Sequence, residues 1–250
     1  MTPIVFLHIP KTAGQTIHHE LQRVVGSDRV SPIRSRAQVD VGEAQMPPGY
    51  DLYSGHLDWT ELESLPENRF VFTVLRSPFE RIASFYFYIL KRAKSMSAAD
   101  LAKSKRVGMQ TVGTVSAPEY FFGGDAKWSN YIQQHYDNFY TRYFATRMIR
   151  GRLQPGETVA EALPRALRNL EMVDRVYSTK NLGALEADIA ERYGAQINLT
   201  STFVNVGSHD RSQERWPMLL DLMDTDEQRE KLTRLAETDL KLIEAIGLQV

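Results

Sequence analysis

The sequence contains no cysteine, and this absence removes several chemistries at once. Such a chain has no disulfide framework, no thiolate metal site and no cysteine nucleophile. It also lacks an excess of charge of one sign, because its formal net charge is −1 at pH 7. A nearly neutral chain exerts no global attraction on nucleic acid or an anionic membrane. We therefore expect no nucleic-acid partner, and a local cluster of positive charge wherever an anion binds.

Long apolar runs are missing as well. No stretch approaches the roughly 18 apolar residues of a membrane span, and the apolar run of residues 1–7 lacks the basic flank of a signal peptide. We expect no membrane span and a cytoplasmic protein, although a chain from which an anchor had been removed would show the same pattern. With 250 residues, of which 42% are hydrophobic, one globular domain over residues 1–250 is expected.

Short apolar strand patterns alternate with helical periodicity along the chain. Strands are predicted at residues 4–9, 50–57, 70–75 and 172–177. Helices are predicted at residues 15–25, from Ser77 to about residue 91, and at 128–144, 159–170, 182–193, 217–223 and 226–246. The composition of residues 93–124 predicts a mobile segment with one short helix, and residues 198–215 lack periodicity. This alternation predicts an α/β fold with a central parallel sheet flanked by helices.

The loop between the first strand and the first helix has the features of an anion site. Its residues are Lys11, Thr12, Ala13, Gly14, Gln15 and Thr16. The first N–H groups of a helix have no internal partner, glycine admits close backbone approach, and lysine adds a full positive charge. The lysine precedes the glycine, so the loop is not the GxxxxGK[ST] motif of ATPases and kinases. The alternative is a plain turn whose threonines cap the helix.

A second candidate segment follows the strand at residues 70–75. Arg76 stands at the carboxyl end of that strand, where ligands bind in open α/β sheets, and Ser84 lies in the following helix. An arginine there is suited to a second phosphate, with the serine hydroxyl as a further donor. The helix itself is predicted to begin with Ser77 as N-cap, Pro78 at the first position and Glu80 closing a capping box. Alternatively, Arg76 is purely structural.

Together the two segments resemble those of a known family. The sequence His8-Ile9-Pro10-Lys11-Thr12-Ala13-Gly14 resembles the 5'-phosphosulfate loop, and Arg76 through Ser84 resembles the 3'-phosphate motif, of sulfotransferases that use 3'-phosphoadenosine-5'-phosphosulfate (PAPS). This group includes heparan sulfate 2-O-sulfotransferase. The resemblance implies a P-loop-like α/β sulfotransferase fold, PAPS as donor, 3',5'-ADP as product, no metal, and a hydroxyl-bearing acceptor for which a glycan is the favoured class.

The resemblance also implies roles for single residues. Lys11 would contact the transferring sulfate and the leaving phosphate, and Arg76 and Ser84 would bind the 3'-phosphate. A weaker match at residues 207–212 resembles a late nucleotide-closing loop and adds three potential 3'-phosphate ligands, Ser208, Arg211 and Ser212. Two positions depart from the pattern: Gln15 replaces the Ser or Thr of many relatives, and Ser77 replaces Asp.

A sulfotransferase needs a base for the acceptor hydroxyl, and His56 is the leading candidate. It follows Gly55 at the end of a predicted strand, and related 2-O-sulfotransferases carry a catalytic histidine in a similar Gly-His segment. General-base catalysis contributes roughly 10² to 10⁴ in rate. Asp58 is a possible orienting partner and Glu20 a rival base. The alternative is that His56 has only a structural role.

Other features leave their function open. The basic stretch formed by Lys91, Arg92, Lys94, Lys103, Lys105 and Arg106 is either a glycan surface or, more commonly, a solvated face. Arg142 and Arg147 either meet substrate or anchor a helix. The alternative to an enzyme is a non-catalytic PAPS- or 3',5'-ADP-binding or scaffold module of the same fold, and a nucleotide kinase is disfavoured by the missing Walker lysine.

Overall fold

A computed structural model of the chain describes residues 1–40, 43–103, 107–200 and 214–250. By its contacts the chain divides into two compact units. The first consists of Met1–Arg76, Thr141–Asp210 and Leu242–Val250, and the second of Ser77–Tyr140 and Arg211–Lys241. The single domain expected over residues 1–250 stays a prediction, and the two units are described separately below.

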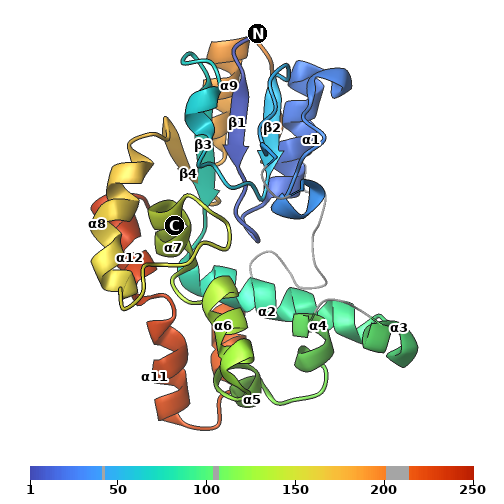
Figure 1. Cartoon of the computed structure of the whole chain (residues 1–250), viewed down its shortest axis with the longest axis vertical. Helices are drawn as coiled ribbons and strands as arrows, with labels where there is room; N and C mark the ends of the chain where they lie inside the picture. The colour runs from blue at the N-terminus through green and yellow to red at the C-terminus, as the bar shows by residue number, and fades with distance from the viewer. Residues whose placement is uncertain (41–42, 104–106, 201–213) are drawn as a thin grey trace. The chain divides into compact units, whose positions relative to one another are not determined.

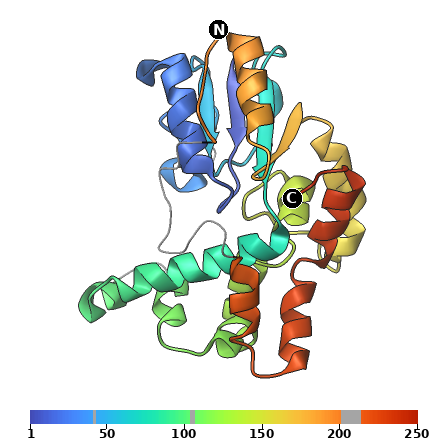
Figure 2. The ribbon, with the colours of Figure 1, turned by 180° about the vertical axis from the view of Figure 1, so that it is seen from behind.

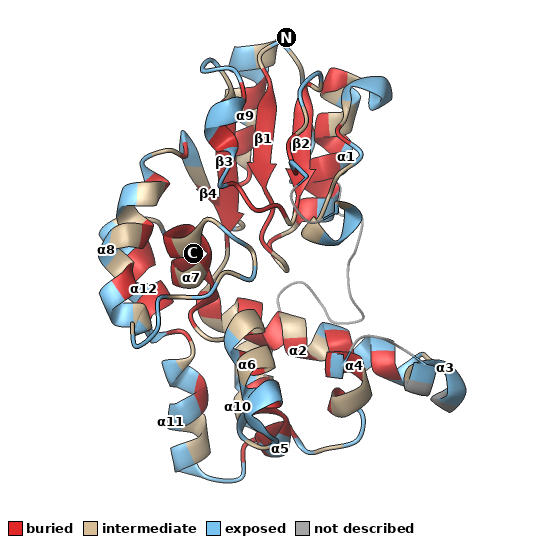
Figure 3. Ribbon diagram, in the orientation of Figure 1, coloured by how far each residue is buried: buried red, intermediate tan, exposed pale blue. Residues whose placement is uncertain are grey.

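The first unit is built on a four-stranded parallel sheet (Figure 1). Its strands, in the spatial order β2-β1-β3-β4, are β1 (Ile4–Leu7), β2 (Leu52–Gly55), β3 (Phe70–Leu75) and β4 (Arg175–Ser178). The first three are buried along their whole length (Figure 3), as expected for parallel strands covered on both faces. This confirms the predicted α/β class and parallel sheet.

Successive side chains of a strand point to opposite faces of the sheet, and one of these sets packs against two helices. Ile4 pairs in register with Leu52 and Phe70, and these three residues share one apolar cluster with the buried residues of α1 (Gly14–Val25) and α9 (Gly183–Tyr193). Figure 2 shows both helices beside the strands. Because β1 lies between β2 and β3, the chain leaves the sheet in opposite directions after β1 and β3, which creates the switch point where ligands bind in open sheets.

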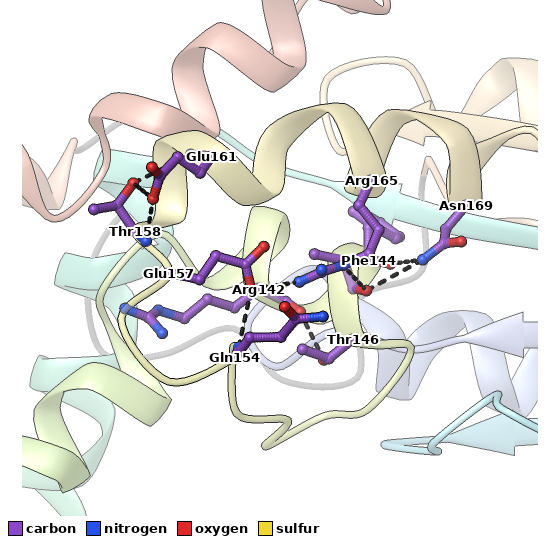
Figure 4. Close-up of polar contacts among 10 residues, drawn as sticks. Arg142, Phe144, Thr146, Gln154, Glu157, Thr158, Glu161, Arg165 and Asn169 are labelled. Carbon is purple, nitrogen blue, oxygen red and sulfur yellow. Dashed lines mark hydrogen bonds and ion pairs between the residues drawn. The ribbon is translucent and has the colours of Figure 1, made fainter.

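Helix α8 (Val159–Leu170) is tied to the end of α7 (Phe139–Thr146) by polar bonds (Figure 4). Arg165 Nε donates to the Ala145 carbonyl at 3.0 Å, and Asn169 Nδ2 donates to the Phe144 carbonyl at 2.8 Å. The helix begins with a capping box between Thr158 and Glu161. These bonds satisfy carbonyls that the end of α7 leaves without helical partners. The unit also contains the 3₁₀ turns η1 (Ser27–Arg29), η2 (Arg36–Gln38) and η3 (Leu62–Ser64).

The second unit is helical. Its long helix α2 (Pro78–Lys94) packs with α4 (Val107–Val112), α5 (Ala117–Phe122), α6 (Ala126–His135) and α10 (Arg215–Leu220) around an aromatic core, and α3 (Ala98–Lys103) continues the chain after α2. Ser77 caps α2 as predicted, since its hydroxyl accepts from the Glu80 N–H at 3.5 Å. The Glu80 carboxylate, however, accepts from the N–H groups of Arg215 and Trp216 at 2.6 and 2.8 Å, and thereby caps α10.

In three places the sequence predicted too few helices. The helix predicted at residues 128–144 is two helices, α6 and α7, because Asn138 takes a left-handed conformation with φ 44°. The helix predicted at 226–246 is likewise α11 (Asp226–Arg234) and α12 (Glu237–Ala245). Residues 93–124 hold α3, α4 and α5 in place of one short helix. No helix among the described residues has the length and apolar character needed to cross a bilayer.

Candidate functional site

The loop after β1 has an unusual backbone. Lys11 and Ala13 both have positive φ, at 75° and 63°, although neither is glycine. A left-handed conformation costs a non-glycine residue roughly 1–2 kcal/mol, and turns of this kind gather N–H groups into anion-binding nests. Ala13 is the N-cap of α1 and supplies no side-chain cap. The start of α1 therefore keeps the positive end of its dipole available to an anion.

Two residues of this loop act differently from the sequence expectation. The Thr12 hydroxyl is fully buried and donates to the Ile9 carbonyl at 2.9 Å, so it holds the loop together. The space that Gly14 leaves is filled by His8: a Cβ at Gly14 would lie 1.9 Å from His8 Nε2. Glycine is thus required there by a neighbouring imidazole. Gln15 is exposed and Thr16 is buried.

His56 follows β2 and is held by the loop after β1. Its Nδ1 lies 2.8 Å from the His8 carbonyl oxygen, and its backbone N–H donates to the Arg34 carbonyl at 2.8 Å. A carbonyl only accepts, so Nδ1 carries the proton and Nε2 of the neutral ring is left as the acceptor. Burial lowers the pKa of His56, the bond to His8 opposes this, and Arg34 and Arg150 lower it further. The ring is therefore in its basic form at neutral pH.

His8 lies beside His56, His18 acts electrostatically on His8, and both imidazoles are neutral at neutral pH. The His8 and His56 ring centroids are 4.4 Å apart. Burial lowers the pKa of His8 well below its usual value, and the nearby His56, Arg34, His18 and Lys11 lower it further. Burial, Arg34 and His19 lower the pKa of His18 to about 4. Arg34 and Arg150 lower the pKa of His56, and Arg34 and Lys11 lower that of His8, so positive charge surrounds imidazoles that stay uncharged.

Arg34 was missed by the sequence analysis. It lies in the polar, proline-punctuated stretch between the first two strands, where periodicity gives no signal. Only the pairing of this stretch with β2 brings Arg34 to the end of that strand beside His56. Spacing along the sequence does not reveal this pairing.

The remaining predicted site residues fall into three groups. Lys11, His56 and Arg76 follow β1, β2 and β3, whose carboxyl ends are adjacent in the sheet. Ser84 is buried on the second turn of α2, in the second unit. Ser208, Arg211 and Ser212 lie outside the described residues. The described part of the chain contains no group of three His, Cys, Asp or Glu residues placed to hold a metal ion.

The secondary candidates prove to have structural partners. Asp58 accepts from Gln45 Nε2 at 3.0 Å and from the Ile149 N–H at 2.8 Å, while the His8 carbonyl orients His56. Glu20 pairs with Arg23 at 3.0 Å and accepts from the Asn198 N–H at 3.1 Å.

Of the two arginines considered for substrate or helix anchoring, Arg147 has an anchoring role. Its Nη2 donates to the Trp59 carbonyl at 2.6 Å and to Glu63 at 2.7 Å. Arg142 lies in the same helix, α7, and projects away from the Arg165 bonds in Figure 4. Its role in substrate binding stays a prediction.

Comparison with known proteins gives one positive result. No curated protein matches the sequence. The sequence model of the sulfotransferase family matches residues 2–244, which is nearly the whole chain and includes both units. The match confirms the resemblance first carried by the segments around Lys11 and Arg76, and it agrees with the parallel α/β sheet and with basic residues at its carboxyl edge. The chain belongs to the sulfotransferase family.

Proposed function

We propose that this protein transfers a sulfuryl group from PAPS to a hydroxyl group of a carbohydrate, with His56 as the general base, and releases 3',5'-ADP. The observation that carries the proposal is the bond between His56 Nδ1 and the His8 carbonyl, 2.8 Å long. It fixes a neutral imidazole with a free accepting nitrogen next to the loop suited to the donor. Membership of the sulfotransferase family supplies the class of reaction.

The loop after β1 suits the phosphosulfate end of the donor. The uncapped start of α1 and the left-handed residues Lys11 and Ala13 favour a tetrahedral oxyanion, and the Lys11 ammonium adds a full charge. Arg76, after β3, is our candidate for the 3'-phosphate. The family resemblance assigns Ser84, Ser208, Arg211 and Ser212 to the same phosphate.

Sulfuryl transfer, like phosphoryl transfer, depends mainly on alignment and charge stabilisation. In the proposed reaction the acceptor oxygen forms a bond to sulfur while the bond between sulfur and the bridging phosphate oxygen breaks. His56 Nε2 takes the hydroxyl proton, and Lys11 stabilises the negative charge that develops on the bridging oxygen. No redox partner is needed, because the electrons of the broken bond leave with 3',5'-ADP.

Carbohydrate is the acceptor class favoured by the resemblance to 2-O-sulfotransferases, and the cytoplasm is the proposed location. Lipid, small-metabolite and peptide hydroxyl groups are the competing acceptors. A screen of these four classes with ³⁵S-labelled PAPS will identify the acceptor by transfer of label.

The central test substitutes the base. We expect His56→Ala to lower sulfuryl transfer from labelled PAPS by about 10² or more, because general-base assistance is lost, while the affinity for 3',5'-ADP measured by calorimetry stays within about twofold. His19→Ala is the matched control, since His19 is exposed on α1. Full turnover by His56→Ala would show that His56 is not the general base. A wild-type protein that binds neither PAPS nor 3',5'-ADP would refute PAPS as the donor.

A further inference from the structure

The segment that carries Arg34 lies along the outer edge of β2. Val30 bridges to Leu52 and Ser35 bridges to His56, both in parallel orientation. Gly55 permits this approach, because a Cβ there would lie 2.2 Å from the Arg34 carbonyl oxygen. The backbone of Arg34 is therefore fixed directly beside the proposed base.

The guanidinium of Arg34 is half-buried but lacks an acidic partner. Its Nε donates to the Ser54 carbonyl at 3.4 Å, which is a long hydrogen bond. No carboxylate of the described residues pairs with it. Five other arginines of the first unit are paired with carboxylates, in the ion pairs Arg23–Glu20, Arg29–Asp51, Arg147–Glu63, Arg165–Glu157 and Arg175–Asp188. Arg34 differs from these five arginines because, among the described residues, only a backbone carbonyl accepts from it, as is also true of Arg36 and Arg69, and it differs from Arg36 and Arg69 in lying beside the proposed base.

An unpaired charge that loses water is unfavourable unless an anion replaces the lost solvation. Among the described residues, Arg34 acts electrostatically on His8, His18 and His56, which are all neutral and therefore do not provide that anion. Lys11 and Arg150 add further positive charge around the same imidazoles. A bound anion would supply the counter-charge that the described residues do not provide.

We propose that Arg34 binds an oxyanion, a sulfate, phosphate or carboxylate group, held beside His56. This deepens the proposed function and rests on it, because the oxyanion belongs either to the acceptor, next to the reacting hydroxyl, or to the phosphosulfate of the donor. The planar guanidinium offers two parallel N–H donors to such a group. The edge position of Arg34, on the side of β1 away from β3 and Arg76, favours the acceptor.

The test uses inorganic sulfate, 3',5'-ADP and PAPS as probes in calorimetry of the full chain. We expect Arg34→Gln to weaken the binding of sulfate at least about tenfold, the loss of one charge-assisted pair, and Arg34→Lys to recover part of it. Arg36→Gln is the matched control, because Arg36 lies on the same segment and its Nη1 donates to the Asp40 carbonyl at 3.1 Å.

The outcomes separate the two sources. A donor contact predicts that Arg34→Gln weakens PAPS far more than 3',5'-ADP, which lacks the sulfuryl group. An acceptor contact predicts unchanged affinity for both nucleotides and weaker sulfate binding in the presence of saturating 3',5'-ADP. Unchanged binding of all three probes, with thermal melting that shows a folded variant, would overturn the proposal. If the protein binds sulfate through Arg34 but binds neither PAPS nor 3',5'-ADP, the proposed function is refuted and the role of Arg34 in oxyanion binding is retained.

Discussion

His8 has two structural roles, one for its backbone carbonyl and one for its side chain. Its carbonyl accepts from His56 Nδ1 and so sets the tautomer of the proposed base. Its imidazole fills the space over Gly14, at the first residue of α1. The strand end, the donor loop and the base are thereby coupled through a single buried side chain and its peptide.

This coupling makes Gly14 sensitive to the smallest substitution. Gly14→Ala places a Cβ 1.9 Å from His8 Nε2, so we expect it to lower the free energy of unfolding by about 1–3 kcal/mol, the usual cost of overpacking. Urea titration of the single and double variants measures it. In a His8→Ala background the same substitution should be nearly neutral or stabilising, because the methyl group then has room. An equal loss in both backgrounds would show that His8 is not the obstacle.

At the scale of residues, the sequence predicted identities better than partners. Lys11, His56 and Arg76 were expected on separate strand ends, and the sheet order brings those ends together. The partner of His56 was expected to be Asp58, which lies two residues away along the chain, and is the His8 carbonyl instead. Backbone carbonyls carry no residue identity, so a motif search does not find them. Arg34 was missed for a similar reason, because an isolated bridge to β2 places it.

At the scale of elements, buried strands and well-capped helices were predictable. Strand β3 and helix α8 have the predicted bounds, because an apolar run and a capping box are purely local signals. The break between α6 and α7 was not predictable from local sequence signals. Besides the left-handed Asn138, the break depends on a non-local contact, because Arg81, from α2, donates to the His135 carbonyl at 2.8 Å at the end of α6. Asn138 then binds α12.

Asn138 stabilises this break in two ways. Its φ of 44° is tolerated best by Asn or Gly, and its Oδ1 accepts from the N–H groups of Thr238 and Asp239 at 2.7 and 3.1 Å. We expect Asn138→Ala to lower the free energy of unfolding by about 2–3 kcal/mol, the sum of a lost helix cap and left-handed strain. Chemical denaturation followed by circular dichroism will measure the loss.

Asn138→Gly separates the two contributions, because glycine removes the cap and tolerates positive φ. It should lose about 1 kcal/mol less than Asn138→Ala. Equal losses would contradict the role of backbone strain, and a neutral Asn138→Gly would contradict the role of the cap.

At the scale of the whole molecule, the net charge of −1 hides a local imbalance. Cations gather at the carboxyl edge of the sheet around neutral imidazoles, while the paired arginines elsewhere in the first unit cancel. This arrangement keeps the proposed base unprotonated at neutral pH. It also couples the stability of the fold to acid, because each neutral buried histidine resists the proton that the unfolded chain accepts.

The sign and range of this pH dependence follow from the direction of the shifts. Burial and Arg34 are among the causes that lower the pKa of His18 from 6.5 to about 4. Below pH 6.5 the unfolded state therefore binds more protons than the folded state, and the free energy of unfolding decreases as the pH is lowered. For His18 alone the loss between pH 7 and about pH 5 is about 2 kcal/mol, and His8 and His56 act in the same direction. Carboxylates such as Asp51, whose pKa is lowered by its bond to Arg29, lose their contribution only at lower pH.

Urea unfolding at several pH values tests this assignment. We expect His18→Leu to remove about 2 kcal/mol of the difference between pH 7 and about pH 5, since leucine does not titrate and fills a buried position whose Nδ1 lacks a hydrogen-bond partner. His19→Gln, at the exposed neighbouring position, should change the slope only slightly, because His19 is the smallest of the three causes that lower the pKa of His18. If the slope persists in His18→Leu, the acid sensitivity arises at His8 and His56, and the environment assigned to His18 is wrong.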